Sequence, residues 1–230
     1  MTEQLTLGID LHEDTTFSNY YIGENAQLVT ALQEIARGRG EQFIYLWGRE
    51  GVGKTHLLQA CCHVADKLKL SPVYLPFKNI ADLSPDVLDG LESLHLVCID
   101  DVDLMGGRPA WEEAFFHFYN RMREENKRLI VAGSVPPQEL GLALKDLVSR
   151  LAWGMTFQAQ ELSDEEKLQA IMLRAKARGL PVPMNVAKFL LNRWHRDMNS
   201  LFEALSTLDH ASLVAKRRLT IPFVKEALGV

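Results

Sequence analysis

The sequence predicts an α/β fold, in which a domain built on a parallel sheet is followed by a smaller all-α domain. Between residues 42 and 158, short β-branched or aromatic runs alternate with amphipathic stretches, a rhythm typical of βαβ units. From Leu162 onward the strand runs stop and helical periodicity continues alone. The 230 residues, of which 47% are hydrophobic, are enough for one full α/β core and a second small unit.

The α/β domain is expected to hold five strands joined by helices. Its strands are predicted at 43–47, 73–75, 96–99, 129–131 and 155–157. Its helices are predicted near 54–68, 84–92, 111–126 and 139–151. Because the strand runs are almost continuously apolar, we expect helices to cover both faces of the sheet.

The all-α domain is predicted to begin at a capping box, in which Ser163 and Glu166 satisfy free N–H groups at a helix start. Gly179 and Pro181 end this first helix. Further helices are predicted at 185–196, 199–216 and 220–228. The predicted domains are an N-terminal extension at 1–14, an α/β domain at 15–161 and a helical domain at 162–230.

Composition argues against several classes of protein. With 25 basic and 30 acidic residues, the formal charge of −5 gives no general attraction to a phosphate backbone, so a dedicated DNA-binding module is not expected. No apolar run is long enough to span a bilayer or to act as an export signal, so we expect a soluble, cytoplasmic protein without membrane contact. Cys61, Cys62 and Cys98 form no C-x-x-C pair, which argues against a zinc site.

The segment Gly48–Thr55 matches the phosphate-binding pattern G-x-x-x-x-G-K-[ST] and lies between a predicted strand and a predicted helix, as that pattern requires. Its glycines let successive N–H groups face phosphates. Lys54 is expected to reach the β- and γ-phosphates, and the Thr55 hydroxyl to ligate Mg²⁺. A chance match in an ordinary turn is the alternative, which the flanking strand and helix disfavour. We therefore predict a site for ADP or ATP, formed by Glu50, Gly51, Val52, Gly53, Lys54, Thr55 and His56.

A later strand ends in the acidic pair Asp100-Asp101, the pattern by which P-loop nucleotide hydrolases place a carboxylate beside the metal. Asp100 is the expected carboxylate on the Mg²⁺ side. Asp101 stands where an active ATPase usually has a glutamate that polarises the attacking water, and aspartate has a shorter reach. The alternative, acidic residues that merely end a strand at the surface, loses weight because a phosphate-binding loop lies upstream.

Three segments together resemble the AAA+ domain of the bacterial replication initiator DnaA and its relatives. They are Gly48–Thr55, Leu96–Asp101 and Ser149–Gly154, with further likeness at 17–20 and 115–117. The resemblance implies a P-loop AAA+ mononucleotide-binding domain with a parallel sheet, followed by a small helical lid. We expect neither a helix-turn-helix domain nor an N-terminal oligomerisation domain, an arrangement similar to that of DnaA-related regulators that inactivate the initiator. The strings 45–47 and 219–226 also resemble such regulators.

The resemblance implies a function for the chain. Such regulators bind ADP, dock on the DNA-loaded sliding clamp (the beta subunit of DNA polymerase III) and stimulate hydrolysis of DnaA-bound ATP, which prevents over-initiation. Gln4, Leu5 and Leu7 are similar to a clamp-binding peptide, whose glutamine anchors one side while leucines fill an apolar groove. A homodimer or higher oligomer would gain avidity on the ring, and DNA would be met through the clamp, in the nucleoid. The alternative is a disordered tail.

Residue roles also follow from the resemblance. Arg150 becomes an arginine finger that is projected onto the nucleotide of another protein, here the ATP of DnaA. The alternative is a surface salt bridge at a helix end, and only the match of the flanking residues 149–154 favours the finger. Tyr21 and Ile22 fall where related proteins line the base pocket.

Two positions depart from the family pattern. Ser134 stands at the sensor 1 position, where aspartate or asparagine is usual, and Asn199 stands at the sensor 2 position, where arginine is usual, with Arg196 three residues earlier. These changes, with Asp101, predict slow or absent hydrolysis by the chain itself. Three alternatives stay open: an autonomous DnaA-like or helicase-loader ATPase, a nucleotide kinase, and an adaptor that is only tethered to the clamp.

Overall fold

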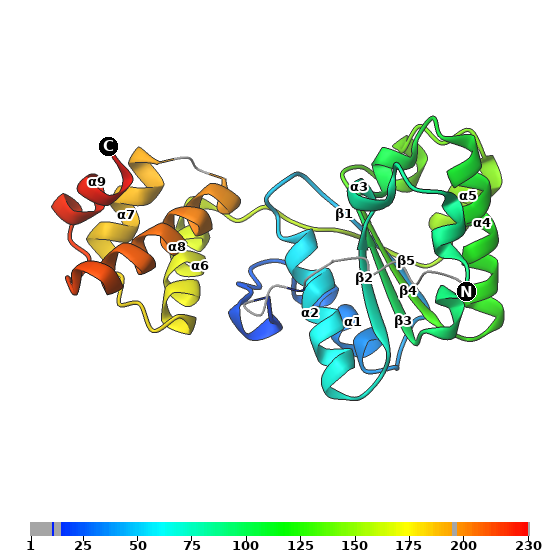
Figure 1. Cartoon of the computed structure of the whole chain (residues 1–230), viewed down its shortest axis with the longest axis horizontal. Helices are drawn as coiled ribbons and strands as arrows, with labels where there is room; N and C mark the ends of the chain where they lie inside the picture. The colour runs from blue at the N-terminus through cyan, green and yellow to red at the C-terminus, as the bar shows by residue number, and fades with distance from the viewer. Residues whose placement is uncertain (1–10, 12–14, 195–196, 230) are drawn as a thin grey trace, which may run out of the picture. The chain divides into compact units, whose positions relative to one another are not determined.

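The computed structural model describes residue 11 and residues 15–194 and 197–229. The chain forms two compact units (Figure 1). Of the described residues, the sheet unit contains 11, 15–16, Gln27–Arg49 and Lys54–Ala159. The helical unit contains Phe17–Ala26, Glu50–Gly53 and the described residues from Gln160 onward. The phosphate-binding loop therefore contributes residues to both units.

The sheet unit is built on five parallel strands in the order β2-β3-β4-β1-β5. The strands are β1 (Phe43–Trp47), β2 (Pro72–Pro76), β3 (Leu96–Asp100), β4 (Arg128–Gly133) and β5 (Met155–Gln158). Strand β1 lies inside the sheet, where Tyr45 is in register with Val131 on one side and Thr156 on the other. The predicted parallel sheet is confirmed, and all five strands carry their C-terminal ends to one edge.

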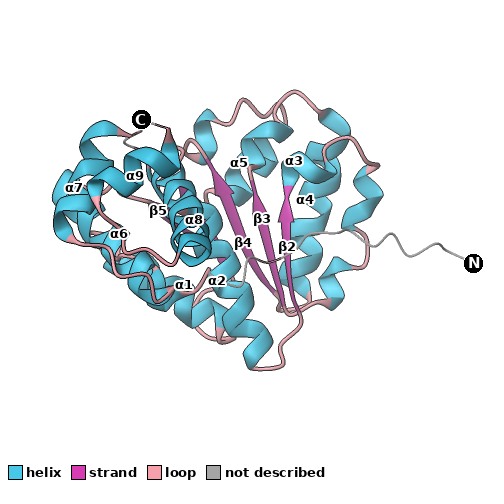
Figure 2. Ribbon diagram, turned by 60° about the vertical axis from the view of Figure 1, so that its left-hand side comes forward, coloured by secondary structure: helices cyan, strands magenta, loops and turns pink. Residues whose placement is uncertain are grey.

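Helices cover both faces of this sheet, as Figures 1 and 2 show. One layer contains α1 (Ala26–Ala36) and α2 (Lys54–Lys67), and the other contains α3 (Phe77–Ile80), α4 (Pro109–Glu124) and α5 (Lys145–Leu151). In the second layer, Phe115 and Phe118 of α4 and Leu147 of α5 pack against strand residues. These three side chains have no exposed surface. This core fixes α4 and α5 to the sheet through apolar contact.

Two predicted helices of the α/β domain are wrong in detail. The segment expected as one helix at 84–92 forms two short 3₁₀ turns, Pro85–Leu88 and Leu91–Ser93. Gly90 between them has a φ of 85°, which a right-handed helix does not accommodate. The helix expected at 139–151 begins only at Lys145, because Gly141, at a φ of 70°, interrupts the segment.

In its described part after residue 160, the helical unit contains four α-helices. They are α6 (Asp164–Ala177), α7 (Met184–Arg193), α8 (Met198–Ala215) and α9 (Ile221–Leu228). The predicted capping box is confirmed: the Glu166 N–H donates to Ser163 Oγ at 3.3 Å, and the Ser163 N–H donates to Glu166 Oε2 at 2.8 Å. The unit has its own apolar core, whose fully buried members include Ile171, Val186, Leu190, Leu201, Leu205, Leu208 and Val224.

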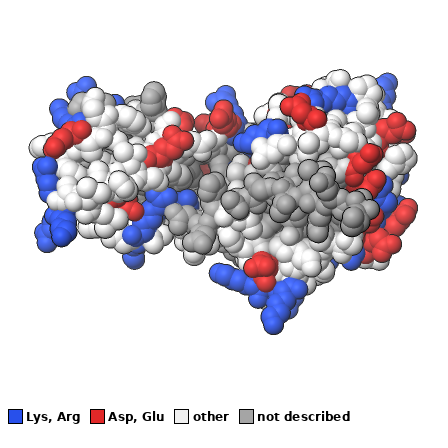
Figure 3. All heavy atoms as spheres, in the orientation of Figure 1, with Lys and Arg blue, Asp and Glu red and all other residues white. Residues whose placement is uncertain are grey.

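The distribution of charged side chains agrees with the mixed charge of the composition. Lys, Arg, Asp and Glu are mixed over the face that Figure 3 shows, without a large area of one sign. Among the described residues, no helix combines the length and the hydrophobicity that a bilayer span requires.

We expect Ser163→Ala to destabilise α6 by about 1 kcal/mol, because the N-cap hydroxyl satisfies a helix-start N–H. Amide hydrogen exchange within α6 should accelerate accordingly. Thr207→Ala is the matched control, since its exposed hydroxyl donates to the Glu203 carbonyl oxygen at 3.1 Å inside α8 and caps nothing. Equal acceleration in the two variants would contradict the assigned cap.

Candidate functional site

The loop 48–53 connects the C-terminal end of β1 to the first turn of α2. Gly51 and Gly53 have φ angles of 82° and 92°, which strain any residue with a side chain. A Cβ on Gly53 would also lie 2.8 Å from Tyr20 Cε2. The backbone therefore takes the curled course that exposes N–H groups at a helix start, an arrangement suited to phosphate.

Lys54, the first residue of α2, directs its ammonium back along this loop. Its Nζ donates to the carbonyl oxygens of Gly48 at 2.7 Å and Arg49 at 3.0 Å. The positive charge therefore lies beside the curled backbone, where it adds to the attraction of the N–H groups for an anion.

The buried carboxylate of Asp100, with 1% exposure, is the centre of the site. The Thr55 hydroxyl donates to its Oδ2 at 2.6 Å and the Tyr74 hydroxyl donates to the same atom at 3.0 Å. The Asp101 N–H donates to Oδ1 at 3.0 Å. Sequence reasoning missed Tyr74, because only the pairing of β2 with β3 brings it to Asp100.

Thr55 and Asp100 fit a magnesium ion. Mg²⁺ prefers oxygen ligands and usually takes one or two from protein, the rest coming from phosphate and water. The described residues contain no cluster of three or more His, Cys, Asp or Glu side chains that would form an all-protein metal cage. The adjoining Thr55 hydroxyl and Asp100 carboxylate would supply two such oxygen donors.

Asp101 is held in the left-handed backbone region, with a φ of 57°. Burial raises the pKa of this carboxyl, and the negative charge of Asp100 raises it further. Lys78, whose Nζ lies 3.8 Å from Asp101 Oδ2, opposes the shift. Asp101 thus has a lysine as an ion-pair partner, and this ammonium offsets part of its negative charge.

The end of β4 lies beside the phosphate-binding loop, since the Gly48 N–H donates to the Gly133 carbonyl oxygen at 3.3 Å. Ser134 follows directly, and its N–H donates to Asp103 Oδ1 at 2.8 Å. The predicted sensor 1 residue is therefore tied to the segment after β3 through an aspartate that sequence reasoning did not single out.

Within the helical unit, the loop residues contact two other segments. The Tyr20 hydroxyl donates to the Val52 carbonyl oxygen at 3.4 Å, and burial raises the pKa of Tyr20 to about 12. A Cβ on Gly51 would lie 3.8 Å from the Met198 backbone nitrogen, at the start of α8. Asn199, the predicted sensor 2 residue, is exposed in the same first turn of α8.

The remaining predicted nucleotide contacts fall in both units. Tyr21 packs against the core of the helical unit, while Ile22 is 42% exposed. In the sheet unit, the His56 ring nitrogen lies 2.8 Å from the Thr16 carbonyl oxygen. The predicted clamp-binding residues Gln4, Leu5 and Leu7, and also Arg196, lie outside the described residues.

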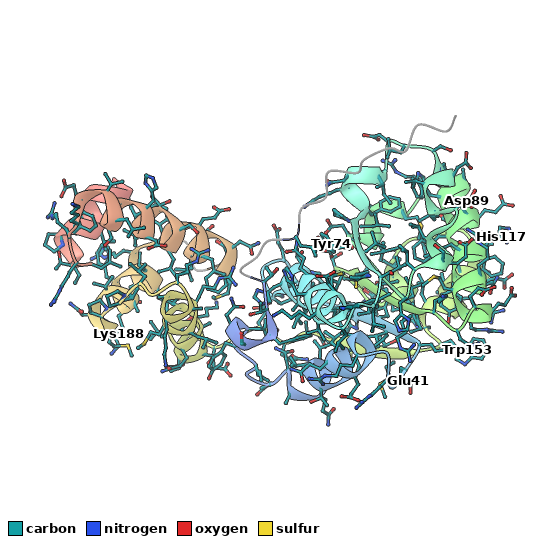
Figure 4. The ribbon with its side chains drawn as sticks, turned by 60° about the horizontal axis from the view of Figure 1, so that its bottom comes forward. Glu41, Tyr74, Asp89, His117, Trp153 and Lys188 are labelled. Atoms are coloured by element: carbon teal, nitrogen blue, oxygen red, sulfur yellow. The ribbon has the colours of Figure 1, made fainter. Side chains whose placement is uncertain are left out.

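Arg150 lies in the last turn of α5, just before β5. Its guanidinium lies 5.2 Å from the ring centroid of Trp153, and the guanidinium of Arg123 lies 4.9 Å from the same centroid. Trp153 is 63% exposed and lines a cavity of about 520 Å³ together with Glu41 (Figure 4). Arg150 is thus held at an exposed edge by cation–π contact.

The N-terminus of α5 is anchored by another residue that sequence reasoning missed. Glu112, with 1% exposure, accepts the Leu144 N–H on Oε2 at 2.8 Å. A buried carboxylate therefore fixes the backbone at which the arginine-bearing helix begins.

This strand order, phosphate-binding loop and acidic strand end, with a helical unit after the sheet, define a P-loop nucleotide-binding protein of the AAA+ class. The family model for the bacterial DnaA ATPase domain matches residues 11–77 and 85–158, more than half of the chain. The chain therefore belongs to the DnaA ATPase-domain family. A second family model, the lid domain of Hda, matches residues 164–228.

Solved structures agree with this assignment. Domain III of the replication initiator DnaA from Thermotoga maritima has a TM-score of 0.83 at 21% identity, over 96% of this chain and 98% of that chain. AMPPCP-bound DnaA from Aquifex aeolicus has a TM-score of 0.74 at 26% identity, over 88% of this chain and 67% of that one. The fold extends to T. maritima RuvB, a Holliday junction branch migration motor, with a TM-score of 0.65 at 17% identity over 90% and 68% of the two chains.

Asp101→Asn should raise the melting temperature of the nucleotide-free protein at pH 7. Because the folded state raises the pKa of Asp101, it holds a proton that the unfolded chain releases, so stability falls as pH rises above the ordinary value of 3.8. The gain from asparagine should therefore shrink as pH is lowered toward 4. Asp82→Asn, at a side chain 98% exposed, is the control and should show no such pH-dependent gain. If Asp101→Asn and the wild type had the same melting temperature at pH 7, the raised pKa of Asp101 in the folded protein would be refuted.

Proposed function

We propose that the chain regulates the initiation of chromosomal replication in the manner of Hda: with ADP bound, it promotes hydrolysis of DnaA-bound ATP through Arg150. The observation that carries the proposal is the position of Arg150 relative to Lys54 in the sheet unit. Lys54, Thr55 and Asp100 lie at the edge where strands end, whereas Arg150 precedes β5 at the edge where strands begin.

The length of the strands separates the two edges. A five-residue strand such as β1 spans about 16 Å at roughly 3.3 Å per residue, which exceeds the reach of an arginine side chain. Arg150 is therefore unsuited to the nucleotide held by its own Lys54, and its exposed edge suits the nucleotide of another molecule. A guanidinium supplied in this way stabilises charge that develops on the transferred phosphoryl group and accelerates hydrolysis by about 10³–10⁵.

The chain's own nucleotide site has binding groups but weak hydrolytic groups. Lys54 and the loop N–H groups bind phosphates, and Thr55 with Asp100 holds Mg²⁺, which neutralises phosphate charge. Asp101 is short, partly neutralised by Lys78 and held in a left-handed conformation. This combination favours retention of ADP, so that the diphosphate sets the conformation of the chain rather than being turned over.

The clamp tether is proposed for the N-terminal extension. Gln4, Leu5 and Leu7 would bind an apolar groove on the sliding clamp, each leucine contributing about 1.5–3 kcal/mol before ordering costs. A homodimer or higher oligomer would bind two sites of the ring and gain avidity. Contact with DNA would then be indirect, which agrees with the net charge of −5, and the protein would work in the cytoplasm at the nucleoid.

One observation favours a second function. Thr55 and Asp100 keep the arrangement that an active P-loop ATPase uses on the magnesium side. An autonomous DnaA-like or helicase-loader ATPase would show DNA-stimulated ATP turnover by the isolated chain, whereas the regulator would not.

Lys54→Ala should weaken ADP binding about 10–100-fold, the loss expected when a charge-assisted hydrogen bond to phosphate is removed. Isothermal titration calorimetry with ADP and Mg²⁺ measures this directly. Lys188→Ala, on an exposed position of α7, should bind ADP as the wild type does. If Lys54→Ala bound ADP as tightly as the wild type does, the proposed nucleotide site would be refuted.

Arg150→Ala should abolish stimulation of DnaA-bound ATP hydrolysis while leaving ADP binding intact. The assay combines ATP-charged DnaA, DNA-loaded clamp and the ADP-charged chain, and measures released phosphate. Arg150→Lys should recover little activity, because lysine lacks the planar fork that a finger uses. Arg37→Ala, which removes an exposed arginine paired with Glu34 at 3.1 Å, is the control and should stimulate normally.

A Gln4→Ala, Leu5→Ala variant in the same assay tests the tether. It should fail with DNA-loaded clamp although Arg150 is intact. If Arg150→Ala stimulated hydrolysis as well as the wild type does, the chain would be an adaptor tethered to the clamp. If the wild type gave no stimulation, the proposed regulatory function would be refuted.

A further inference from the structure

Tyr74 places a buried hydroxyl directly on the carboxylate at the nucleotide site. It lies in β2, is 7% exposed, and donates to Asp100 Oδ2 at 3.0 Å. Tyr74 lies outside the phosphate-binding pattern 48–55. In Figure 4, Tyr74 lies well away from Trp153, consistent with the opposite edge of the sheet.

The sheet register explains how the hydroxyl reaches Asp100. Tyr74 pairs with Cys98, and Asp100 is two residues further along β3 on the same face. The tyrosine side chain therefore leans along the sheet toward the strand end. There its hydroxyl donates to Asp100 Oδ2.

Tyr74 and Thr55 share one oxygen of the carboxylate but differ in what else they must do. Thr55 donates its single hydroxyl proton to Asp100 Oδ2 at 2.6 Å, which leaves its lone pairs for a cation. Tyr74 is 7% exposed and its hydroxyl donates to the carboxylate itself, so we assign it to orienting Asp100 and not to binding the cation. It supplies a fixed donor that orients Asp100 whichever way the Thr55 hydroxyl turns.

We propose that Tyr74 is a positioning residue that couples nucleotide binding to magnesium, by fixing the orientation of the Asp100 carboxylate beside Thr55. The inference rests on the proposed nucleotide site. It adds that the magnesium dependence of nucleotide binding relies on Tyr74. Outer partners of metal ligands typically change metal affinity about 10–100-fold when removed. A side chain that only filled the core would affect stability but not the magnesium dependence of binding.

The test measures ADP affinity by calorimetry with excess Mg²⁺ and again with EDTA, and takes the ratio as the magnesium coupling. Tyr74→Phe should lower this ratio about tenfold or abolish it, while affinity in EDTA stays at the wild-type value. Tyr45→Phe is the matched control: it removes another buried tyrosine hydroxyl of the sheet, which donates to the Val135 carbonyl oxygen at 2.8 Å. The control should keep the wild-type coupling.

The outcomes separate this inference from the proposed function. Wild-type coupling retained in Tyr74→Phe overturns the role of Tyr74 and leaves the nucleotide site standing. Binding of ADP by wild type without any magnesium coupling also overturns it, whereas absence of ADP binding by wild type overturns the nucleotide site as well. If thermal melting shows Tyr74→Phe to be unfolded, Tyr74→Met provides a second variant, because its flexible side chain fills the space and has no donor.

Discussion

The parallel direction of the five strands is the constraint on which the functional geometry depends. Parallel strands send all their C-terminal ends to one edge, so the phosphate-binding loop after β1, Asp100 at the end of β3 and Ser134 after β4 meet there. The same rule sends the residues before each strand to the other edge, where Arg150 lies. One sheet therefore carries the phosphate-binding loop and Arg150 at opposite edges.

At the nucleotide edge, the energetic problem is a carboxylate with 1% exposure. Burying such a charge without partners is costly, and three donors from three segments of chain offset the cost. Thr55 comes from α2, Tyr74 from β2, and the N–H of Asp101 from the following loop. The orientation of the carboxylate is therefore fixed by the protein's own donors. Its neighbour Asp101 instead has an exposed lysine partner, Lys78.

At the other edge, Arg150 is held by contacts that a short helix would not provide alone. Glu112 fixes the start of α5, and the Trp153 ring lies against the guanidinium at its end. Arg123 shares that ring, so positive charge is concentrated around one exposed aromatic side chain. Preorganised charge of this kind is effective toward a phosphoryl group because little reorganisation is needed when it meets the group.

The sequence by itself determined the elements whose signals are local. The β-branched and aromatic runs predicted the five parallel strands. Ser163 and Glu166 predicted a helix start. The glycines, Lys54 and Thr55 predicted a phosphate-binding loop between a strand and a helix. Only the tertiary structure decided which distant side chains meet. Tyr74 reaches Asp100 through strand order, and Glu112 reaches the start of α5 through helix packing. No spacing along the chain encodes such pairs, because they depend on sheet register and on how helices pack over it.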